Sequence, residues 1–265
     1  MQSNNVKPLV SIIMNCYNGE KYLYESISTI INQTYKNWEL IFWDNLSTDN
    51  SKEILEKFTD ERIKYFKSTK FTNLYEARNL AINKSLGEYI AFLDTDDIWE
   101  NEKLEKQLDF INKNKKFQVV FSNHYVLKEF KKIKTIRHKS KLPSGEITQS
   151  LLDYYSLGIL TVLLSKNIFN HYKFDNNYSI IGDFDFFINL SKKFKIGSIN
   201  TPLATYRIHK SNYSIEKIDK HVSELRAWIK KNEKTLKLEG FNLTKQKFFL
   251  FKLIIKSLFR KFLNF

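Results

Sequence analysis

Cysteine, proline and glycine are scarce in this chain of 265 residues, which has one cysteine, three prolines and seven glycines. A single cysteine excludes an intramolecular disulfide and any zinc site built from several cysteines, and it fits a reducing compartment such as the cytoplasm. So few prolines, together with 42% hydrophobic residues, exclude a disordered or collagen-like chain. The length and the apolar content predict one large α/β domain, or one domain with an extension.

Two kinds of long apolar segment are also missing. The first ten residues, MQSNNVKPLV, have no basic region followed by an apolar core, so we expect no secretory signal there. Basic residues interrupt the C-terminal stretch, residues 245–265, too often for a transmembrane span.

Positive charge is in excess, with 43 Lys and Arg against 29 Asp and Glu and a formal net charge of +14. This charge suggests a nucleic-acid-binding protein as one hypothesis, whose affinity would fall steeply with salt. The lysines, however, are spread over segments with helical periodicity, and the richest cluster lies among aromatic residues at the C-terminus. We therefore expect no nucleic acid as a partner, and instead an anionic membrane surface or a phosphorylated substrate.

In the first hundred residues, short apolar runs alternate with segments of helical periodicity. Residues 9–18, LVSIIMNCYN, are typical of a buried parallel strand that ends in polar residues. The alternation predicts a mostly parallel, Rossmann-like sheet flanked by helices. Asn50 and Glu53 are spaced like a helix-capping pair. The remaining strands are expected at 37–45, 62–66 and 87–93, and the helices at 19–33, 47–58 and 73–85.

The pattern beyond residue 100 is less regular. The basic stretch at 128–146 predicts a hairpin or loop, and residues 195–209 predict two short strands with a turn at Pro202. No repeat or low-complexity linker marks a domain boundary. We expect further helices at 101–114, 166–173 and 183–193, and further strands at 117–127 and 158–166.

Polar side chains end three of the predicted strands: Asn15 and Tyr17, then Asp44, then Asp94 with Asp96. In open α/β sheets, ligands bind beyond the carboxyl ends of the strands. The sequence therefore predicts that these side chains meet at one edge of the sheet.

The third of these strands runs into three aspartates, YIAFLDTDDIW. Divalent cations prefer carboxylate oxygens, and Mg²⁺ takes one or two of them together with substrate phosphates. The alternative is that Asp96 or Asp97 caps the next helix. A haloacid-dehalogenase-type phosphatase also has an apolar D-x-D motif, but there it follows the first strand and is trailed by Thr or Val. Here it follows the fourth predicted strand, and position 98 is Ile.

Four blocks of the sequence together resemble the family 2 glycosyltransferases of the GT-A fold. The resemblance implies a nucleotide-diphosphate sugar as donor, a divalent cation (Mn²⁺ or Mg²⁺) and transfer with inversion at the anomeric carbon. The blocks are VSIIMNCYNGEKYLYESISTIINQTYKNWELIFWDNLSTDNS, EARNLAINKSLGEYIAFLDTDDIW, IGDFDFFINL and YRIHKSNYS.

For the donor nucleotide, the resemblance implies that Asn15, Tyr17 and Asp44 hold the base and ribose, and that Arg78 and Asp94 lie at the donor site. The alternatives are that Tyr17 belongs to the core and that Arg78 forms an ion pair on a helix surface.

For the metal and the reaction, the resemblance implies that Asp94 and Asp96 form the metal pair, with Asp96 as the direct ligand. It implies that His209 completes the metal–diphosphate site and that Asp183 is the catalytic base. His209 as an ordinary surface histidine is the alternative, as are Asp183 and Asp185 as helix N-terminal charges. Asp185 is the second candidate for the base.

Four positions depart from the family pattern. Cys16 stands where proline or a small residue is usual, and we interpret it as structural. Asn45 and Leu46 replace an aspartate and a glycine, and Gly182 replaces the glutamate of a Glu-Asp pair.

The C-terminal stretch at 245–265 places Lys252, Lys256 and Arg260 four residues apart among apolar residues. A basic amphipathic helix of this kind can lie in the headgroup region of an anionic bilayer, while the alternative is packing on the protein's own core or on another chain. We predict a GT-A domain at 1–214, with a donor half at about 1–100 and an acceptor half at about 101–214, and a helical extension at 215–265.

The predicted function is that of a metal-dependent inverting glycosyltransferase. Its acceptor is expected to be a glycan or lipid-linked glycan of a bacterial surface polysaccharide, on the inner face of the cytoplasmic membrane. A non-catalytic nucleotide-sugar-binding scaffold is the alternative, and whether the chain forms a homo-oligomer stays open.

Overall fold

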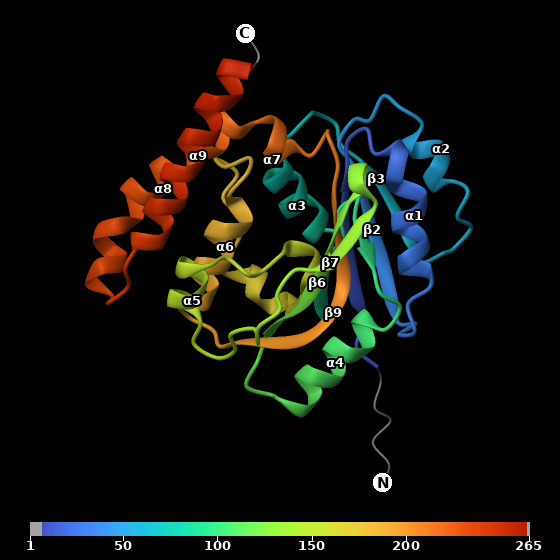
Figure 1. Cartoon of the computed structure of the whole chain (residues 1–265). Helices are drawn as coiled ribbons and strands as arrows, with labels where there is room; N and C mark the ends of the chain where they lie inside the picture. The colour runs from blue at the N-terminus through green and yellow to red at the C-terminus, as the bar shows by residue number, and fades with distance from the viewer. Residues whose placement is uncertain (1–6, 264–265) are drawn as a thin grey trace.

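The centre of the computed structural model is a mixed sheet, which has nine strands within the described residues, 7–263 (Figure 1). The strand order is β3-β2-β1-β4-β8-β6-β9-β5, and β7 pairs with β6. The parts of the predictions that fall on residues 1–6 and 264–265 lie outside the described residues. The strands are β1 (Val10–Cys16), β2 (Trp38–Asp44), β3 (Ile63–Lys67), β4 (Tyr89–Phe92), β5 (Ile98–Trp99), β6 (Val119–Lys128), β7 (Ile133–Ile136), β8 (Val162–Ser165) and β9 (Ile196–Ile208).

Most of the sheet runs in one direction. β1 is parallel to both β2 and β4, and β2 is parallel to β3. β8 is antiparallel to both of its neighbours, β4 and β6, so β6 and its parallel partner β9 share the direction of β1. The predicted α/β class and mostly parallel sheet are confirmed, and the carboxyl ends of these strands lie at one edge.

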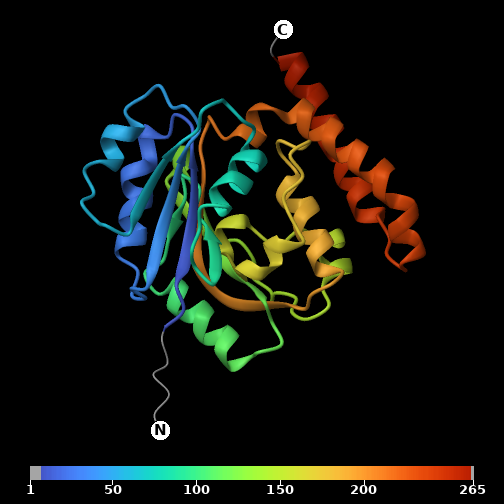
Figure 2. The same cartoon turned by 180° about the vertical axis from the view of Figure 1, so that it is seen from behind.

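Two layers of helices cover the two faces of the sheet (Figures 1 and 2). Ile12 and Met14 of β1 face one apolar cluster and Ile13 faces the other, because side chains alternate along a strand. One cluster includes α1 (Glu20–Ile31), α2 (Ser51–Leu55) and α4 (Lys103–Lys113), and the other includes α3 (Leu74–Ile82), α5 (Thr148–Asp153), α6 (Gly182–Ser191) and α8 (Ile218–Leu238).

Two local predictions are wrong. Residues 196–208 form one strand, β9, in place of two, because Pro202 sits opposite Asn123 at an irregularity where the register with β6 shifts. Proline lacks an N–H group and is tolerated in sheets at such bulges. The Asn50–Glu53 capping pair is absent, since the Asn50 side chain donates to Glu20 Oε2 at 2.7 Å instead.

The C-terminal helices pack on the rest of the chain. α8 and α9 (Thr244–Leu263) lie against each other, and Trp228, Leu236 and Leu253 belong to the same apolar cluster as α3 and α6. A division of the chain near residue 214 stays a prediction. None of the helices within residues 7–263 is long and apolar enough to cross a membrane.

Candidate active site

The ends of β1 and β2 form the first part of the site. Cys16 pairs with Asp44 across the two strands. The buried Asp44 carboxylate accepts hydrogen bonds from the Ser47 N–H at 2.7 Å and the Tyr65 hydroxyl at 2.8 Å. Tyr17 is 53% exposed, so its interpretation as a core residue is wrong.

At the end of β1, Asn15 has an amide nitrogen without a partner in the described part of the chain, and Tyr17 has an exposed ring. The Asn15 Nδ2 atom is buried without a hydrogen-bond partner among the described residues. The Tyr17 ring lies edge-on to Phe71, with ring centroids 4.9 Å apart. Two exposed aromatic rings beside a buried amide suit a planar, polar group such as a nucleobase.

Arg78 and Asp94 form the second part. Arg78 projects from α3 and is buried, so its interpretation as a partner on a helix surface is wrong. Its Nη2 atom donates to both oxygens of Asp94, at 2.8 and 3.0 Å. Asp94 lies two residues after the end of β4, and the ion pair therefore ties α3 to the carboxyl edge of the sheet.

Asp96 and His209 form the third part. His209 Nε2 lies 2.9 Å from Asp96 Oδ2, and the Asn212 amide donates to the same oxygen at 3.3 Å. Burial and the charge of Asp94 raise the pKa of Asp96, against the lowering effect of the His209 contact. His209 is buried, so its interpretation as an ordinary surface histidine is wrong.

Asp97 has a different role from the one expected. It does not cap a helix, since α4 begins at Lys103. Its buried carboxylate accepts the backbone N–H of Arg207 at 2.9 Å, which fixes the end of β9 beside the aspartates. His209 follows two residues later and is brought to Asp96 in this way.

Asp183 lies in the first turn of helix α6 and forms the fourth part. Its Oδ1 atom accepts the N–H of Phe184 at 2.8 Å and lies 3.3 Å from the Tyr75 hydroxyl, which also donates to the Ile180 carbonyl at 2.8 Å. Burial raises the pKa of Asp183, and the nearby Arg78 charge opposes this rise. A carboxylate with a raised pKa beside a cation is suited to accept a proton.

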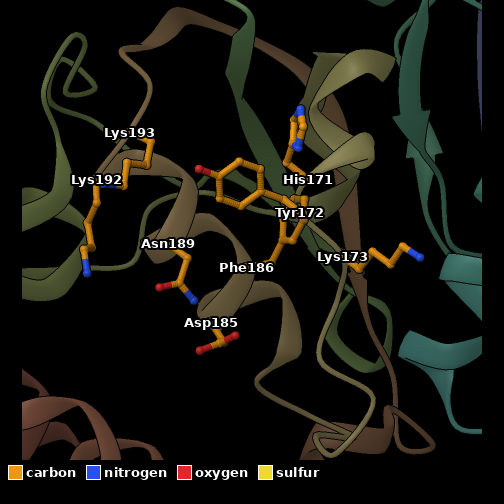
Figure 3. Close-up of a pocket in the computed structure, with 8 residues that line it drawn as sticks. All are labelled: His171, Tyr172, Lys173, Asp185, Phe186, Asn189, Lys192 and Lys193. Carbon is orange, nitrogen blue, oxygen red and sulfur yellow. The ribbon is translucent and has the colours of Figure 1, made fainter.

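Asp185, the second candidate for the base, has a structural partner. Its carboxylate accepts the indole N–H of Trp228 at 2.7 Å and is buried. It also lines a cavity of about 280 Å³ between residues 171–173 and α6 (Figure 3). That cavity includes neither Asp183 nor Asp96, and it is separate from the carboxyl edge of the sheet.

A sequence model described as "Glycosyl transferase family 2" matches residues 11–172. The chain belongs to this family. The Escherichia coli UDP-Glc:alpha-D-GlcNAc-diphosphoundecaprenol beta-1,3-glucosyltransferase WfgD is 34% identical over 211 residues, which cover 79% of this chain and 81% of that protein. The relatives of this chain include proteins named glycosyltransferases, and the chain is therefore an enzyme of this class.

Solved structures show the same fold. TarS from S. aureus in complex with UDP-GlcNAc matches with a TM-score of 0.66 and 17% identity, covering 82% of this chain and 64% of that chain. A mannosyltransferase from Pyrobaculum calidifontis in complex with GDP-Man and Mn²⁺ matches with a TM-score of 0.62 and 14% identity, covering 85% and 65%. The predicted GT-A fold is confirmed, and this chain spans just under two thirds of each solved chain.

The metal site predicted for this glycosyltransferase is incomplete as a protein site. Among residues 7–263, no three His, Cys, Asp or Glu side chains are arranged to hold a metal ion. Asp96 and His209 are in contact, but the Asp94 carboxylate is bound to Arg78. A cavity of about 390 Å³ opens beside His209, and it is lined by Lys21, Glu129, Phe130, His209, Lys210 and Ser211.

Tyr75 and Asn212 were missed as site residues from the sequence. Asn212 lies in the block YRIHKSNYS that carries the family resemblance, and this block was the available signal for it. Tyr75 gives no such signal, because its contact with Asp183 joins residues 108 positions apart.

The departure at Asn45 is explained by its partner. The Asn45 amide donates to the Thr72 carbonyl at 2.7 Å and accepts from the Thr72 N–H and hydroxyl. An aspartate could not donate this bond. Asn45 thereby fixes the segment that carries Phe71 next to Tyr17.

Leu46, the second of these departures, has a φ of 68°. This is the left-handed conformation that suits the glycine usual at this position.

Proposed function

We propose that this family 2 glycosyltransferase is a metal-dependent, inverting enzyme that uses a nucleotide-diphosphate sugar. The observation that carries the proposal is the separation of two acidic groups at one sheet edge. Asp96 contacts His209, whereas the half-buried Asp183 lies near Arg78 and Tyr75. A single displacement needs such a division, because one group must bind the leaving diphosphate and another must accept the acceptor's proton.

The proposed roles on the donor side follow from the contacts. Tyr17 and Phe71 border the base, and Asn15 and Asp44 bind the base and ribose. Arg78 holds Asp94 in place beneath the donor and supplies a positive charge near the reacting centre.

Asp96 and His209 fit a divalent cation such as Mn²⁺ or Mg²⁺, with Asp94 as a further candidate ligand. One carboxylate and one imidazole are too few for a self-contained site, but Mg²⁺ is commonly held by one or two carboxylates plus substrate phosphates. When bound, such an ion neutralises the charge that develops on the departing nucleotide diphosphate.

In the transfer step, Asp183 takes the proton of an acceptor hydroxyl. The hydroxyl oxygen then forms a bond to the anomeric carbon of the donor sugar, and the bond from that carbon to the diphosphate breaks. The products are the glycosylated acceptor and the nucleoside diphosphate, and attack from the face opposite the leaving group inverts the anomeric carbon.

We infer the acceptor and location from the relative in Escherichia coli, whose name specifies UDP-Glc and a GlcNAc-diphosphoundecaprenol acceptor. UDP-glucose and a lipid-linked GlcNAc diphosphate are the first pair to test for this chain. Such an acceptor lies in a membrane, so the proposed place of work is the inner face of the cytoplasmic membrane, in surface polysaccharide biosynthesis.

Thermal unfolding with a panel of nucleotide-diphosphate sugars, with and without Mn²⁺, tests the proposal. A ligand that binds only the native state raises the free energy of unfolding, and the rise grows with the ratio of free ligand concentration to Kd. At a ratio of one hundred the rise is about 2.7 kcal/mol. We expect Mn²⁺ to increase the rise in Tm caused by the correct donor. Asp96→Asn should remove this Mn²⁺-dependent part, and the control Asp185→Asn should retain it. A donor effect that is the same without Mn²⁺ would contradict the role of the metal.

A further inference from the structure

The outer side of α9 is apolar and largely exposed, and the described chain meets it only at its border, where the Phe249 ring lies edge-on to His221 of α8 with centroids 5.9 Å apart. Six large apolar side chains on it are between 37% and 63% exposed. The opposite side of the helix is buried through Gln246, Leu253 and Ser257. A surface helix normally turns its polar side to solvent, so α9 has a second apolar side. We call this surface the α9 outer face, and it consists of Phe248, Phe249, Phe251, Ile255, Leu258 and Phe259, with Lys252 and Lys256 among them.

The charge on α9 is of one sign. Residues 244–263 include six Lys and Arg residues and no Asp or Glu. Lys247 and Lys261 pair with Glu233 and Asp219 of α8, on the side of the protein. Lys252 and Lys256 are exposed beside the apolar residues, and the Lys252 ammonium lies 4.5 Å from the centre of the Phe248 ring.

We propose that the α9 outer face binds the surface of an anionic phospholipid bilayer, with its Phe, Ile and Leu side chains among the acyl chains. A helix with this composition lies in the plane of the interface, where apolar burial and attraction to anionic lipid add together. A second copy of this chain is a poorer partner, since a twofold contact between two such faces would bring lysines against lysines with no acidic residue of α9 between them.

The position of α9 connects this surface to the active site. Its last turns contact the segment that follows His209: Arg260 donates to the Glu216 carbonyl at 3.3 Å, and Lys261 pairs with Asp219 at 3.2 Å. The C-terminal end of α9 lies at the same end of the molecule as α7 (Tyr213–Glu216) (Figures 1 and 2). A bilayer against α9 would thus lie beside the carboxyl edge of the sheet. This part rests on the proposed function, because a lipid-linked acceptor would then reach Asp183 from the membrane.

Vesicle co-sedimentation of the full chain tests the proposal. The probes are phosphatidylcholine vesicles and vesicles in which roughly one lipid in three is phosphatidylglycerol, an anionic lipid. We expect binding to the anionic vesicles that weakens with salt. Lys252→Gln with Lys256→Gln should weaken it about 30-fold, because each basic residue near such a surface contributes about 1 kcal/mol. Phe251→Ser with Phe259→Ser should weaken it about tenfold or more by removing apolar burial.

Leu86→Ser is the matched control, because Leu86 is 77% exposed and lies far along the chain from α9. It should bind as the wild type does. Failure of the wild type to bind either vesicle, or equal binding by the α9 variants, would overturn the proposal. The proposal would also be overturned if the wild type bound no vesicles but formed a dimer in analytical ultracentrifugation, and if the Phe variants were monomers. The α9 outer face would then be a contact between two copies of the chain. Glycosyl transfer to a water-soluble acceptor is measured separately: its absence with vesicle binding intact would refute the proposed function alone.

Discussion

The ring of Tyr75 fills the space beside the candidate base that a side chain at position 182 would need. A Cβ atom at Gly182 would lie 2.6 Å from two carbons of this ring, which is closer than real atoms approach. The glutamate usual at this position in the family could therefore not be accommodated here. Tyr75 instead places its hydroxyl between the Ile180 carbonyl and Asp183. We interpret Tyr75 as a positioning residue for the base.

Tyr75→Phe should move the acid limb of the pH–activity profile to higher pH. Burial raises the pKa of Asp183, and the hydrogen bond from Tyr75 is one of the contacts that oppose this rise. Removing the hydroxyl raises the pKa further, and the base must be charged to accept a proton. The measurement is kcat/KM against pH, with Tyr172→Phe, which removes a hydroxyl at the cavity of Figure 3, as the control. A lower rate at every pH with an unmoved limb would show a purely structural role.

At the scale of elements, helix α8 holds the first turn of α6. The Trp228 indole donates to Asp185 at 2.7 Å, and its ring meets Phe184 edge-on at 4.7 Å between centroids. Both contacts are made by the two residues that follow Asp183, namely Phe184 and Asp185. Helix α8 therefore positions the candidate base, although it lies outside the region matched by the family model, 11–172.

This packing predicts different effects for two substitutions. Asp185→Asn keeps an acceptor for the indole N–H. Because Asp185 takes no part in the proposed reaction, the rate of glycosyl transfer should remain within about threefold of the wild type. Trp228→Phe leaves a buried carboxylate without its donor and should lower the free energy of unfolding by about 1–3 kcal/mol. The measurements are initial rates and urea unfolding. If Asp185→Asn abolished transfer while Asp183→Asn did not, Asp185 would be the base.

Across the whole molecule, the mostly parallel sheet and the polar residues at its carboxyl edge could be predicted because they depend on local patterns. Apolar runs such as LVSIIMNCYN identify buried strands, and the polar residues after them identify the carboxyl edge. The turn predicted at Pro202 was wrong because it relied on a local pattern alone. The effect of Pro202 on β9 depends on the bulge opposite Asn123, which belongs to another strand.

The contacts within the site could not be predicted from local patterns. His209 meets Asp96 across 113 positions, and Tyr75 meets Asp183 across 108. The resemblance to the family supplied both residues of the first contact and Asp183 of the second, but Tyr75 and Gly182 are features of this chain. Their packing follows from tertiary structure alone.

The division of labour between Asp96 and Asp183 is tested most directly by Asp183→Asn, assayed for donor binding and for transfer in the same preparation. Burial disfavours a charged carboxylate at this position, so the neutral asparagine should leave Tm unchanged or raise it. We expect an unchanged Mn²⁺-dependent Tm increase with the donor, and a transfer rate lower by roughly 10²–10⁴-fold. Transfer at the wild-type rate by this folded, donor-binding variant would show that Asp183 is not the base.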